Sequence, residues 1–548
     1  MTSLPNQSET YDVIIIGGGI VGSGIARDCA QRGLKVALFE REDYGYGTTS
    51  RSTRLIHGGL RYLEMLDFGL VRQDLKERET LLKIAPHRVQ PLPFILPFYR
   101  CSLFYRLKVR VGMLLYDLLS YDKTLPNHRY LTRTETLEME QGLQAKGLQG
   151  AAMYYDCQAA FPERLCLDNI LSAQRDGAVV FNHTEIVDTL RGTEGGVCGV
   201  RVRNRLTGEE PEFRGRLIIN ATGAWVDRLL KGWKTPLPLQ LRLTKGIHFA
   251  APLANKNALV LFSKKDKRLM FVIPWLGYSW IGTTDTDFDT NLDTVHALRD
   301  EIAYLQETVS EYLPQNNWSE AYFTNAGVRA LVRDNRPGAS ESAVSRKHGV
   351  LLHTHGDGLE GMITILGGKL TAYRDIAEEV VNRACELLQH RVEGRTGTIP
   401  LPGGERNDLK NLKAEVGRAG SEYGLTQAQT DYLVSLYGSE AYAILNRIEY
   451  DASLAKPLSP EYPDIRAQVV HAIEAEQAQT LNDFLLRRSL LGFTKDQGEQ
   501  AIPAILEMMA VPLKWEAERV AEERSAALAH IALTRQHREV VTKSDMNT

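Results

Sequence analysis

The sequence has few cysteines, no long apolar run and no strong net charge. Its six cysteines are scattered without Cys-x-x-Cys spacing, which disfavours a zinc knuckle or a disulfide scaffold and fits a reducing compartment. No stretch approaches the roughly 20 apolar residues that span a bilayer. Residues 1–10 are polar and contain no Lys or Arg, so they predict neither secretion nor organelle import. The 65 basic and 68 acidic residues give a net charge of −3, which excludes a global field that recruits nucleic acid.

The length of the chain points to more than one domain. The chain has 548 residues, whereas a single core stops growing at about 250–300 residues, so two or three domains are expected. Hydrophobic residues make up 43% and charged residues 24% of the sequence. These values are ordinary for a globular protein and exclude wholesale disorder.

Short apolar runs predict strands up to about residue 400, and helical spacing dominates beyond it. A buried strand at Tyr11–Ile16, a helix at Ile25–Arg32 and a strand at Lys35–Phe39 form one predicted βαβ unit. Later predicted strands are Ala178–Phe181, Val197–Arg203, Arg216–Ile219, Leu269–Pro274, Ser279–Thr284, Gly349–His353 and Met362–Leu366. A helix is predicted at about 370–388. After Pro400 the sequence changes from short apolar runs to apolar residues at helical spacing. This change places a domain boundary near residue 400.

A glycine-rich turn inside the βαβ unit predicts a dinucleotide site. Gly17 permits the tight turn, Gly19 lets the backbone approach a pyrophosphate, and Gly22 lets the helix pack on the strand. The helix N-terminus offers free N–H groups to the phosphates. Glu40, at the end of the next strand, is placed to accept hydrogen bonds from a ribose without a 2′-phosphate. This fingerprint alone does not decide between NAD and FAD.

Several further blocks carry a more specific pattern. Residues 47–64 read GTTSRSTRLIHGGLRYLE and residues 367–374 read GGKLTAYR. Between them stand NATGAWV at 220–226, KGIH at 245–248, IGTTD at 281–285, GVR at 327–329 and SR at 345–346. In this order the blocks resemble the FAD-dependent glycerol-3-phosphate dehydrogenases of the aerobic, quinone-linked type. LPGG at 401–404 resembles the opening of that family's C-terminal domain. The resemblance spans nearly the whole chain and implies FAD.

The resemblance implies an α/β plus α fold. A Rossmann-like FAD-binding lobe would be assembled from about 11–90, 160–235 and 346–399. A mixed-sheet, glycine-oxidase-like substrate lobe would use about 91–159 and 236–345. Together they form an oxidoreductase domain over 1–399, followed by a helical C-terminal domain over 400–548.

The sequence also departs from the family pattern at several positions. Val21 stands where the family usually has Asn, and Ala224 stands where it usually has Pro. The family has paired aspartates before Ala-Arg-Leu, whereas here Asp156 is followed by a different segment, residues 157–165.

The family reaction oxidises glycerol 3-phosphate to dihydroxyacetone phosphate, with hydride passing from C2 to flavin N5. A dianionic phosphate favours clustered Arg and Lys side chains. By motif position Arg61, Arg346 and Lys369 resemble the substrate-site cations, and Tyr62 could add a hydroxyl donor. Arg329 is assigned to the catalytic set on the same basis. The alternative for any of these arginines is a surface ion pair.

His248 is the first choice for the base that accepts the C2 hydroxyl proton. An imidazole near its unperturbed pKa can do so at neutral pH. His57 is the second candidate, and we favour a role against the flavin ring for it. The alternative for His57 is a histidine that satisfies backbone groups in a tight loop.

The remaining flavin contacts follow from the matched blocks. They are Thr48, Ser50, Ser52, Gly59, Leu60, Ala221, Gly223, Gly368, Leu370 and Thr371, in addition to Gly17, Gly19, Gly22, Glu40 and His57. The strand-to-helix turn at 367–370 would place N–H groups at the flavin N1/C2=O edge. No metal site is expected.

The segment Phe98–Leu119 interleaves basic with aromatic and aliphatic residues. This pattern suits the plane of an anionic membrane surface, and the alternative is a core helix with a basic edge. Since the family passes electrons to membrane quinone, the resemblance favours a monotopic protein on the cytoplasmic face of the cell membrane. A homodimer is a candidate assembly.

Three other functions remain open. A glycerophosphate oxidase would use oxygen as acceptor, although the insertion that family oxidases tend to carry is not found. A related flavin oxidase could act on another small substrate, which the cationic residues disfavour. A non-catalytic flavin sensor is disfavoured because His248 and the Arg/Lys set are both present.

Overall fold

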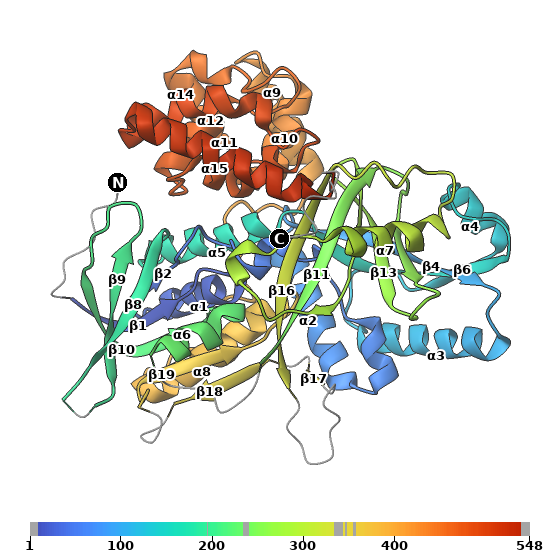
Figure 1. The fold of residues 1–548 in the computed structure, drawn as a ribbon, viewed down its shortest axis with the longest axis horizontal. Coiled ribbons are helices and arrows are strands. Elements are labelled where there is room, and N and C mark those ends of the chain that lie inside the picture. The colour runs from blue at the N-terminus through green and yellow to red at the C-terminus, as the bar shows by residue number, and fades with distance from the viewer. Residues whose placement is uncertain are drawn as a thin grey trace, which may run out of the picture.

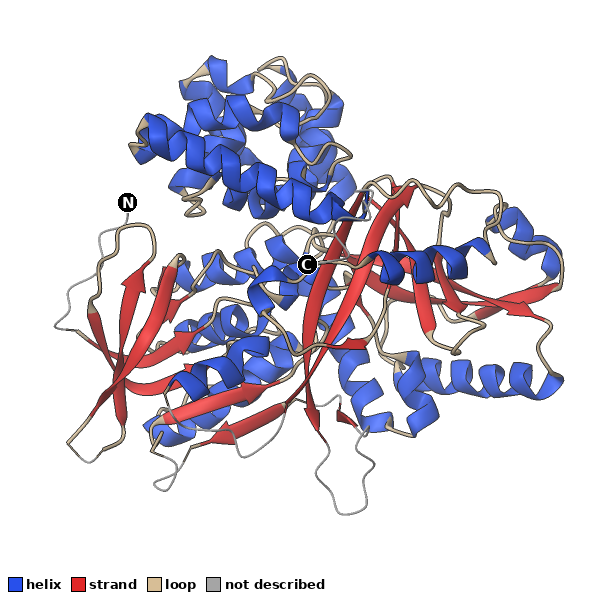
Figure 2. Ribbon diagram, viewed as in Figure 1, coloured by secondary structure: helices blue, strands red, loops and turns tan. Residues whose placement is uncertain are grey.

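The computed structural model describes residues 9–193, 195–233, 241–333, 344–345, 348–353 and 358–538, apart from the side chains of Arg61, Arg333, Val344, Ser345 and Arg538. Two sheets lie side by side, and a layer of helices from the end of the chain covers one side of them (Figure 1). Figure 2 shows that the described residues of this last layer are helical and contain no strand.

The first sheet, here called the nucleotide sheet, has eight strands among the described residues. They are β1 (Thr10–Ile16), β2 (Val36–Phe39), β7 (Val179–Phe181), β8 (Thr184–Arg191), β9 (Val197–Asn204), β10 (Glu212–Asn220), β18 (Gly349–Leu352) and β19 (Met362–Leu366). The central order is β18-β19-β10-β1-β2-β7, and β1 pairs in parallel with both β2 and β10. The carboxyl ends of β1, β2 and β10 therefore meet at one edge, where such sheets bind ligands.

β1 is buried on both of its faces, which explains its continuous apolar sequence. Val13 and Ile15 pack with α1 (Ile20–Gln31), while Ile14 and Ile16 pack with residues of β9 and β10. α1 in turn packs against α5 (Pro162–Arg175) and α8 (Tyr373–Leu388). The predicted βαβ unit is confirmed.

The second sheet, here called the substrate sheet, is mixed and has eleven strands among the described residues. They are β3 (Leu55–Ile56), β4 (Val89–Tyr99), β5 (Arg129–Leu131), β6 (Leu148–Ala159), β11 (Leu241–Pro252), β12 (Ala258–Phe262), β13 (Leu269–Trp275), β14 (Tyr278–Gly282), β15 (Thr286–Asp287), β16 (Phe323–Arg333) and β17 (Val344–Ser345). β11 lies between β14 and β16, with His248 opposite Gly282 and Asn325. β4 pairs with β6 over almost its whole length.

The other helices fall into two groups. Those before residue 400 are α2 (Phe68–Ile84), α3 (Leu103–Leu119), α4 (Arg133–Met139), α6 (Val226–Gly232) and α7 (Arg299–Ser310). Those after it are α9 (Leu409–Ser421), α10 (Gln427–Tyr437), α11 (Ala441–Tyr450), α12 (Arg466–Glu474), α13 (Leu481–Asp483), α14 (Ile502–Leu513) and α15 (Ala517–Arg535). In Figure 1 α3 lies at the edge of the molecule away from this second group.

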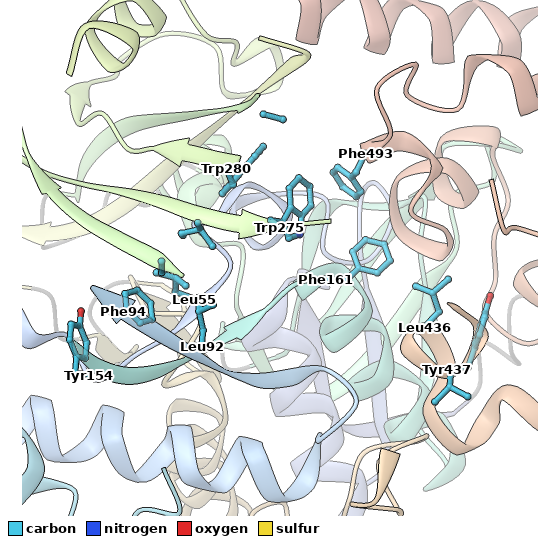
Figure 3. Packing of buried hydrophobic residues seen from close by; sticks show 14 of the residues in the cluster. Leu55, Leu92, Phe94, Tyr154, Phe161, Trp275, Trp280, Leu436, Tyr437 and Phe493 are labelled. Carbon is cyan, nitrogen blue, oxygen red and sulfur yellow. The ribbon is translucent and has the colours of Figure 1, made fainter. Parts of the chain in front are cut away.

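An aromatic cluster joins the substrate sheet to the C-terminal helices (Figure 3). The ring of Phe493 lies 5.4 Å from that of Trp275 and 5.8 Å from that of Phe161, between centroids. These residues share one buried apolar cluster with Trp280 of β14 and Tyr437 of α10. The two parts of the chain thus form a continuous core.

The predicted strands are present with small shifts of their ends, and β19 has the predicted bounds. The first helix begins at Ile20 rather than Ile25. Two glycines, Gly22 and Gly24, lower helix propensity there, but close packing favours them. A Cβ atom added at Gly24 would lie 3.0 Å from the ring of Tyr373.

Candidate functional site

A cavity of about 560 Å³ lies where the two sheets meet. Its wall contains most of the predicted site residues: Gly17, Gly19, Glu40, Thr48, Ser52, His57, Tyr62, Ala221, Gly223, His248, Arg329, Gly368, Lys369, Leu370 and Thr371. Gly22, Ser50, Gly59 and Leu60 do not line it. Arg346 lies outside the described residues, and of Arg61 only the backbone is described, in the 3₁₀ turn η2 (Leu60–Met65).

The glycine-rich turn leaves no room for larger residues at two positions. Gly17 has φ of +102°, and a Cβ atom there would lie 2.8 Å from the Ala221 carbonyl oxygen. A Cβ atom at Gly22 would lie 1.9 Å from the Gly17 carbonyl oxygen. Gly19 occupies the N-cap of α1 and has no side chain to cap it, while the Ile20 N–H donates to Thr49 Oγ1. Gly19, Ile20 and Val21 line the cavity, so the positive end of α1 faces a space that suits an anionic group.

Glu40 anchors the turn from the end of β2. Its Oε2 accepts the Gly18 N–H at 2.7 Å, and its Oε1 accepts the Glu42 N–H at 2.9 Å. Burial raises the pKa of this carboxyl above its ordinary value. Each carboxylate oxygen retains a second lone pair, so the side chain can still accept a ribose hydroxyl.

The loop after Glu40 presents backbone as well as hydroxyl groups. Thr48 Oγ1 donates to the Val328 carbonyl at 2.7 Å, and the Ile20 N–H donates to Thr49 Oγ1 at 3.0 Å. Ser50 Oγ donates back to Tyr46 within its own turn at 2.9 Å, which explains why it does not reach the cavity. Ser52 Oγ accepts the Arg54 N–H at 3.2 Å.

His57 makes hydrogen bonds that hold its own loop, and it also lines the cavity. Its Nδ1 accepts the Gly59 N–H at 3.1 Å, and its own backbone N–H donates to Thr371 Oγ1 at 3.1 Å. In the neutral ring the proton therefore resides on Nε2. The two predicted flavin segments, 47–60 and 367–371, are joined by this contact.

His248 is buried in the substrate sheet on the cavity wall. Its Nε2 lies 3.1 Å from Thr53 Oγ1, and its ring stacks on Trp280 with centroids 5.2 Å apart. Nδ1 is buried and has no hydrogen-bond partner among the described residues, so a bound ligand or water would have to satisfy it. Burial and the nearby Arg329 and Arg54 guanidiniums lower its pKa well below the ordinary value. The expectation of a near-unperturbed imidazole is wrong, and the ring is neutral at pH 7.

Arg329 projects from β16 beside His248. Its Nη2 donates to Thr283 Oγ1 at 2.9 Å, and its Nη1 lies 3.3 Å from Asp285 Oδ1. A Cβ atom at Gly246 would lie 2.2 Å from Nη2. The glycine of the KGIH block therefore makes room for this guanidinium. The structure thus gives a physical reason for a glycine at this position of the motif.

Lys369 lines the cavity from the turn between β19 and α8. Its Nζ donates to Asp74 Oδ2 at 2.7 Å and lies 4.1 Å from the centre of the Tyr62 ring. Asp74 is fully buried, and this burial raises its pKa to about 6 although Lys369 opposes the shift. Tyr62 therefore supports Lys369 with its ring face, a contact that the prediction of a hydroxyl donor did not include.

Several residues at the site escaped the sequence reasoning. They are Thr53, Arg54, Asp74, Glu163 and Trp280. Both Arg54 terminal nitrogens donate to Glu163 at 2.9 Å, and its guanidinium lies 4.5 Å from the Trp275 ring centre. Thr53 and Arg54 stand inside the matched block, so their position was a usable signal, whereas Asp74 and Trp280 carry no local signal.

Asp156, which directly precedes the segment that departs from the family pattern, has a structural role. Asp156 of β6 is buried and accepts hydrogen bonds from Tyr116 Oη at 2.8 Å and Arg78 Nη1 at 2.7 Å. The Gly58 N–H points at the same pair, 3.0 Å from Tyr116 Oη and 3.3 Å from Asp156 Oδ1. Tyr116 lies on α3, so this cluster ties a surface helix to the loop next to His57.

The comparisons with known proteins cover both parts of the chain. Residues 12–374 match the FAD dependent oxidoreductase family, and residues 394–520 match the C-terminal domain of alpha-glycerophosphate oxidase. A glycerol-3-phosphate dehydrogenase of Synechocystis sp. is 39% identical over 530 residues, 94% of this chain and 95% of that protein. The Bacillus halodurans glycerol-3-phosphate dehydrogenase complexed with FAD has a TM-score of 0.81 at 26% identity, covering 98% and 97% of the two chains. Glycine oxidase from Geobacillus kaustophilus shares the fold, with a TM-score of 0.52 at 20% identity over 72% of this chain and 99% of that chain.

Proposed function

The chain belongs to the FAD-dependent glycerol-3-phosphate dehydrogenase family, and from this we propose that its cavity oxidises sn-glycerol 3-phosphate to dihydroxyacetone phosphate. FAD is the cofactor. The observation that carries the proposal is that one cavity gathers the glycine-rich turn, His57, His248, Arg329 and Lys369 from separate segments of the chain. A nucleotide cradle and a cationic substrate end then share one space.

The residues present fit the cofactor. Gly17 and Gly22 leave no room for a side chain, and the N-terminus of α1 lines the cavity through Gly19, Ile20 and Val21. These features suit a pyrophosphate, and Glu40 suits the adenosine ribose. When bound, FAD accepts the hydride that leaves C2 of the substrate.

At the substrate end, we assign the phosphate to cationic side chains. Arg329 offers a planar fork from β16, and Lys369 offers a point charge from the turn after β19. Arg61, Arg346 and Tyr62 remain proposed members of this group. Two cations held at fixed positions orient the bound alcohol, which converts binding energy into correct alignment of C2.

We assign proton acceptance to His248. Because burial and two nearby guanidiniums keep its ring neutral, it can accept a hydrogen bond and then the proton from the C2 hydroxyl. Thr53 and Trp280 hold the plane of the ring. Arg329, next to it, favours the anionic form of the reacting hydroxyl by its charge.

Anaerobic mixing of the holoenzyme with sn-glycerol 3-phosphate tests the reaction. We expect bleaching of the oxidised flavin absorbance, with glycerol and the enantiomeric phosphate as inactive controls. An unchanged spectrum would favour a flavin-binding sensor. Bleaching by substrates that lack phosphate would favour another oxidase. Hydrogen peroxide formed with oxygen as sole acceptor would favour the glycerophosphate oxidase.

We further propose that α3 rests on an anionic membrane surface, where reduced flavin would be reoxidised by quinone. Within the described residues, no helix is long and apolar enough to cross a bilayer. Only Met113 and Tyr116 of α3 are buried. Its other face exposes large apolar side chains, namely Leu103, Phe104, Leu107, Val111, Leu114 and Leu118, and Lys108 pairs with Glu64 of η2 at 3.0 Å. An exposed apolar stripe flanked by basic residues suits the interfacial plane better than water.

Vesicle flotation tests this surface. Replacing Leu103, Phe104 and Leu107 by Ser should lower binding to phosphatidylglycerol vesicles at least tenfold, while turnover with a soluble dye stays unchanged. Val511→Ser, an equally exposed apolar position on α14, is the matched control. Loss of dye turnover in the triple variant would assign α3 to folding or catalysis instead. The cytoplasmic location, the boundary near residue 400 and a homodimer remain predictions.

A further inference from the structure

A buried ionic cluster joins the C-terminal helices to the loop that follows Glu40. Asp43 in this loop is fully buried and accepts hydrogen bonds from both Arg487 and Arg488, including Arg488 Nη2 at 3.0 Å. Arg487 Nη2 also donates to Asp483 Oδ1 at 3.1 Å, and Asp483 Oδ2 lies 2.9 Å from His183 Nε2. Two carboxylates thus face two guanidiniums with almost no solvent between them.

The same loop is bound tightly to the nucleotide turn. The Gly45 N–H donates to the Gly18 carbonyl at 2.9 Å, while the Gly18 N–H donates to Glu40. A Cβ atom at Gly18 would lie 2.9 Å from Tyr44 Cδ1, so the Tyr44 ring covers this glycine. Tyr44 Oη in turn donates to Gln477 Oε1 at 2.6 Å. Contacts therefore run without a break from the C-terminal helices to the glycine-rich turn.

Asp43 does not itself line the cavity, whereas Glu40, Arg41, Glu42, Tyr46 and Gly47 on either side of it do. It can influence a nucleotide only by fixing the path of the loop. Since ordering a loop on binding costs free energy, a loop that is already fixed binds more tightly. Removing one member of a buried ionic cluster leaves uncompensated charges that force the chain to move.

We propose that Asp43 is a positioning residue for FAD, held by Arg487 and Arg488, and that the C-terminal helices thereby retain the cofactor. The inference rests on the proposed function only in that FAD occupies the cavity. This inference assigns a function to the C-terminal helices, which have no role in the proposed chemistry of the cavity. The loop between β2 and the 3₁₀ turn η1 (Thr48–Arg51) is the element on which both parts of the chain act.

FAD release from the full-length holoenzyme tests the proposal, because free flavin fluoresces and its appearance needs no turnover. We expect Asp43→Asn to raise the dissociation constant for FAD at least tenfold. At saturating FAD, KM for sn-glycerol 3-phosphate should stay within twofold. Wild-type protein that fails to bind FAD would contradict the proposed function itself. FAD affinity of D43N equal to wild type would contradict the inference alone.

Glu476→Gln is the matched control. Glu476 forms an equally buried ion pair across the same interface, with Arg164 of α5 at 2.7 Å. Its contact with Arg488 uses the backbone carbonyl, at 2.7 Å from Nη2, and the substitution keeps that carbonyl. This variant should keep FAD affinity within twofold. Equal weakening in both variants would show general loosening of the C-terminal helices and would overturn the positioning role.

A milder variant covers the case in which D43N does not fold. Tyr44→Phe removes only the hydrogen bond to Gln477 and keeps the ring over Gly18. It should raise the dissociation constant about threefold, at unchanged melting temperature of the FAD-free protein. An unchanged dissociation constant in Y44F, with D43N unfolded, would also overturn the proposal.

Discussion

The nucleotide end and the substrate end of the cavity use different kinds of chemical group. At the nucleotide end the decisive groups are backbone atoms, because Gly17 and Gly22 admit no side chain and α1 offers its N-terminus. At the substrate end the decisive groups are side chains, and each depends on a partner from another segment, as Lys369 depends on Asp74 and His248 on Thr53. The glycines of the first end are therefore visible in the local sequence, although the loop after Glu40 is held by Arg487 and Arg488. The second end is encoded by the whole fold.

If this contrast is correct, the largest effect comes from a single methyl group at the nucleotide end. Gly22→Ala places a Cβ atom 1.9 Å from a carbonyl oxygen that cannot move without opening the turn. The purified variant should contain no FAD, as measured by its visible absorbance. Gly33→Ala is the control, since Gly33 has φ of +82° but open space around it. That variant should lose about 1 kcal/mol of stability and retain FAD.

The next effect tests the substrate end. His248→Asn should lower kcat by about 100-fold or more, because general bases contribute that much, while FAD remains bound. His353→Asn is the matched control. His353 is also buried and lies 2.9 Å from a threonine hydroxyl, that of Thr364, but it is not part of the cavity wall. Loss of FAD from H248N would show that the two ends are not separate.

The lowered pKa of His248 also predicts a pH effect. Activity needs the neutral ring, so the acid limb of kcat/KM due to His248 should lie well below pH 6.5. Because the unfolded chain binds this proton near pH 6.5 and the folded chain does not, stability falls as pH drops below 6.5. H248N should remove this loss, which amounts to about 1.4 kcal/mol per pH unit at most. Urea titrations at pH 5 and 7 measure it, and equal pH dependence in both proteins would contradict it.

Arg329→Ala should have an effect of about 10- to 100-fold on kcat/KM, since charged hydrogen bonds contribute about 1.5–3 kcal/mol. Both KM and kcat should change, because Arg329 is assigned to the phosphate and to the reacting hydroxyl. Arg329→Lys keeps the charge but loses the fork, and should recover part of the loss. Arg242→Ala is the control, because Arg242 lies on the neighbouring strand β11, pairs with Asp287 and does not line the cavity. An equal defect in R242A would assign the effect of R329A to the sheet rather than to the substrate.

The same contrast explains how much of the fold was predictable. Tyr11–Ile16 and Lys35–Phe39 are apolar apart from Asp12 and Lys35, because strands buried on both faces need no alternation, and both strands are present. The start of α1 was misplaced because Gly22 and Gly24 look unfavourable for a helix until the fold places Gly17 against Gly22 and α8 against Gly24. The pairing of β3 with β6 in the substrate sheet has no sequence signal, since register between distant segments depends on tertiary packing.

For the site, motif position brought His57, His248, Arg329 and Lys369 to one cavity. Chemical environment could not be predicted in the same way. Nothing near residue 248 in the sequence indicates that Trp280 and two guanidiniums surround the ring. Asp74 stands in the middle of α2 with no motif around it, and only the fold brings it to Lys369.

The smallest predicted effect concerns the ion pair between Asp74 and Lys369. Burial raises the pKa of Asp74 to about 6, so Asp74 is ionised at pH 7.5 and largely protonated at pH 5. Asp74→Asn mimics the protonated form, and it frees the Lys369 charge to act on the substrate phosphate. KM for sn-glycerol 3-phosphate should therefore fall about threefold at pH 7.5, a modest value typical of a partly screened ion pair. At pH 5 the KM values of the two proteins should converge.

Taking the ratio of their KM values cancels the ionisation of the substrate itself, so any remaining pH dependence belongs to Asp74. A ratio that does not change with pH, or a KM that rises in D74N, would show that Asp74 holds Lys369 in place rather than moderating its charge.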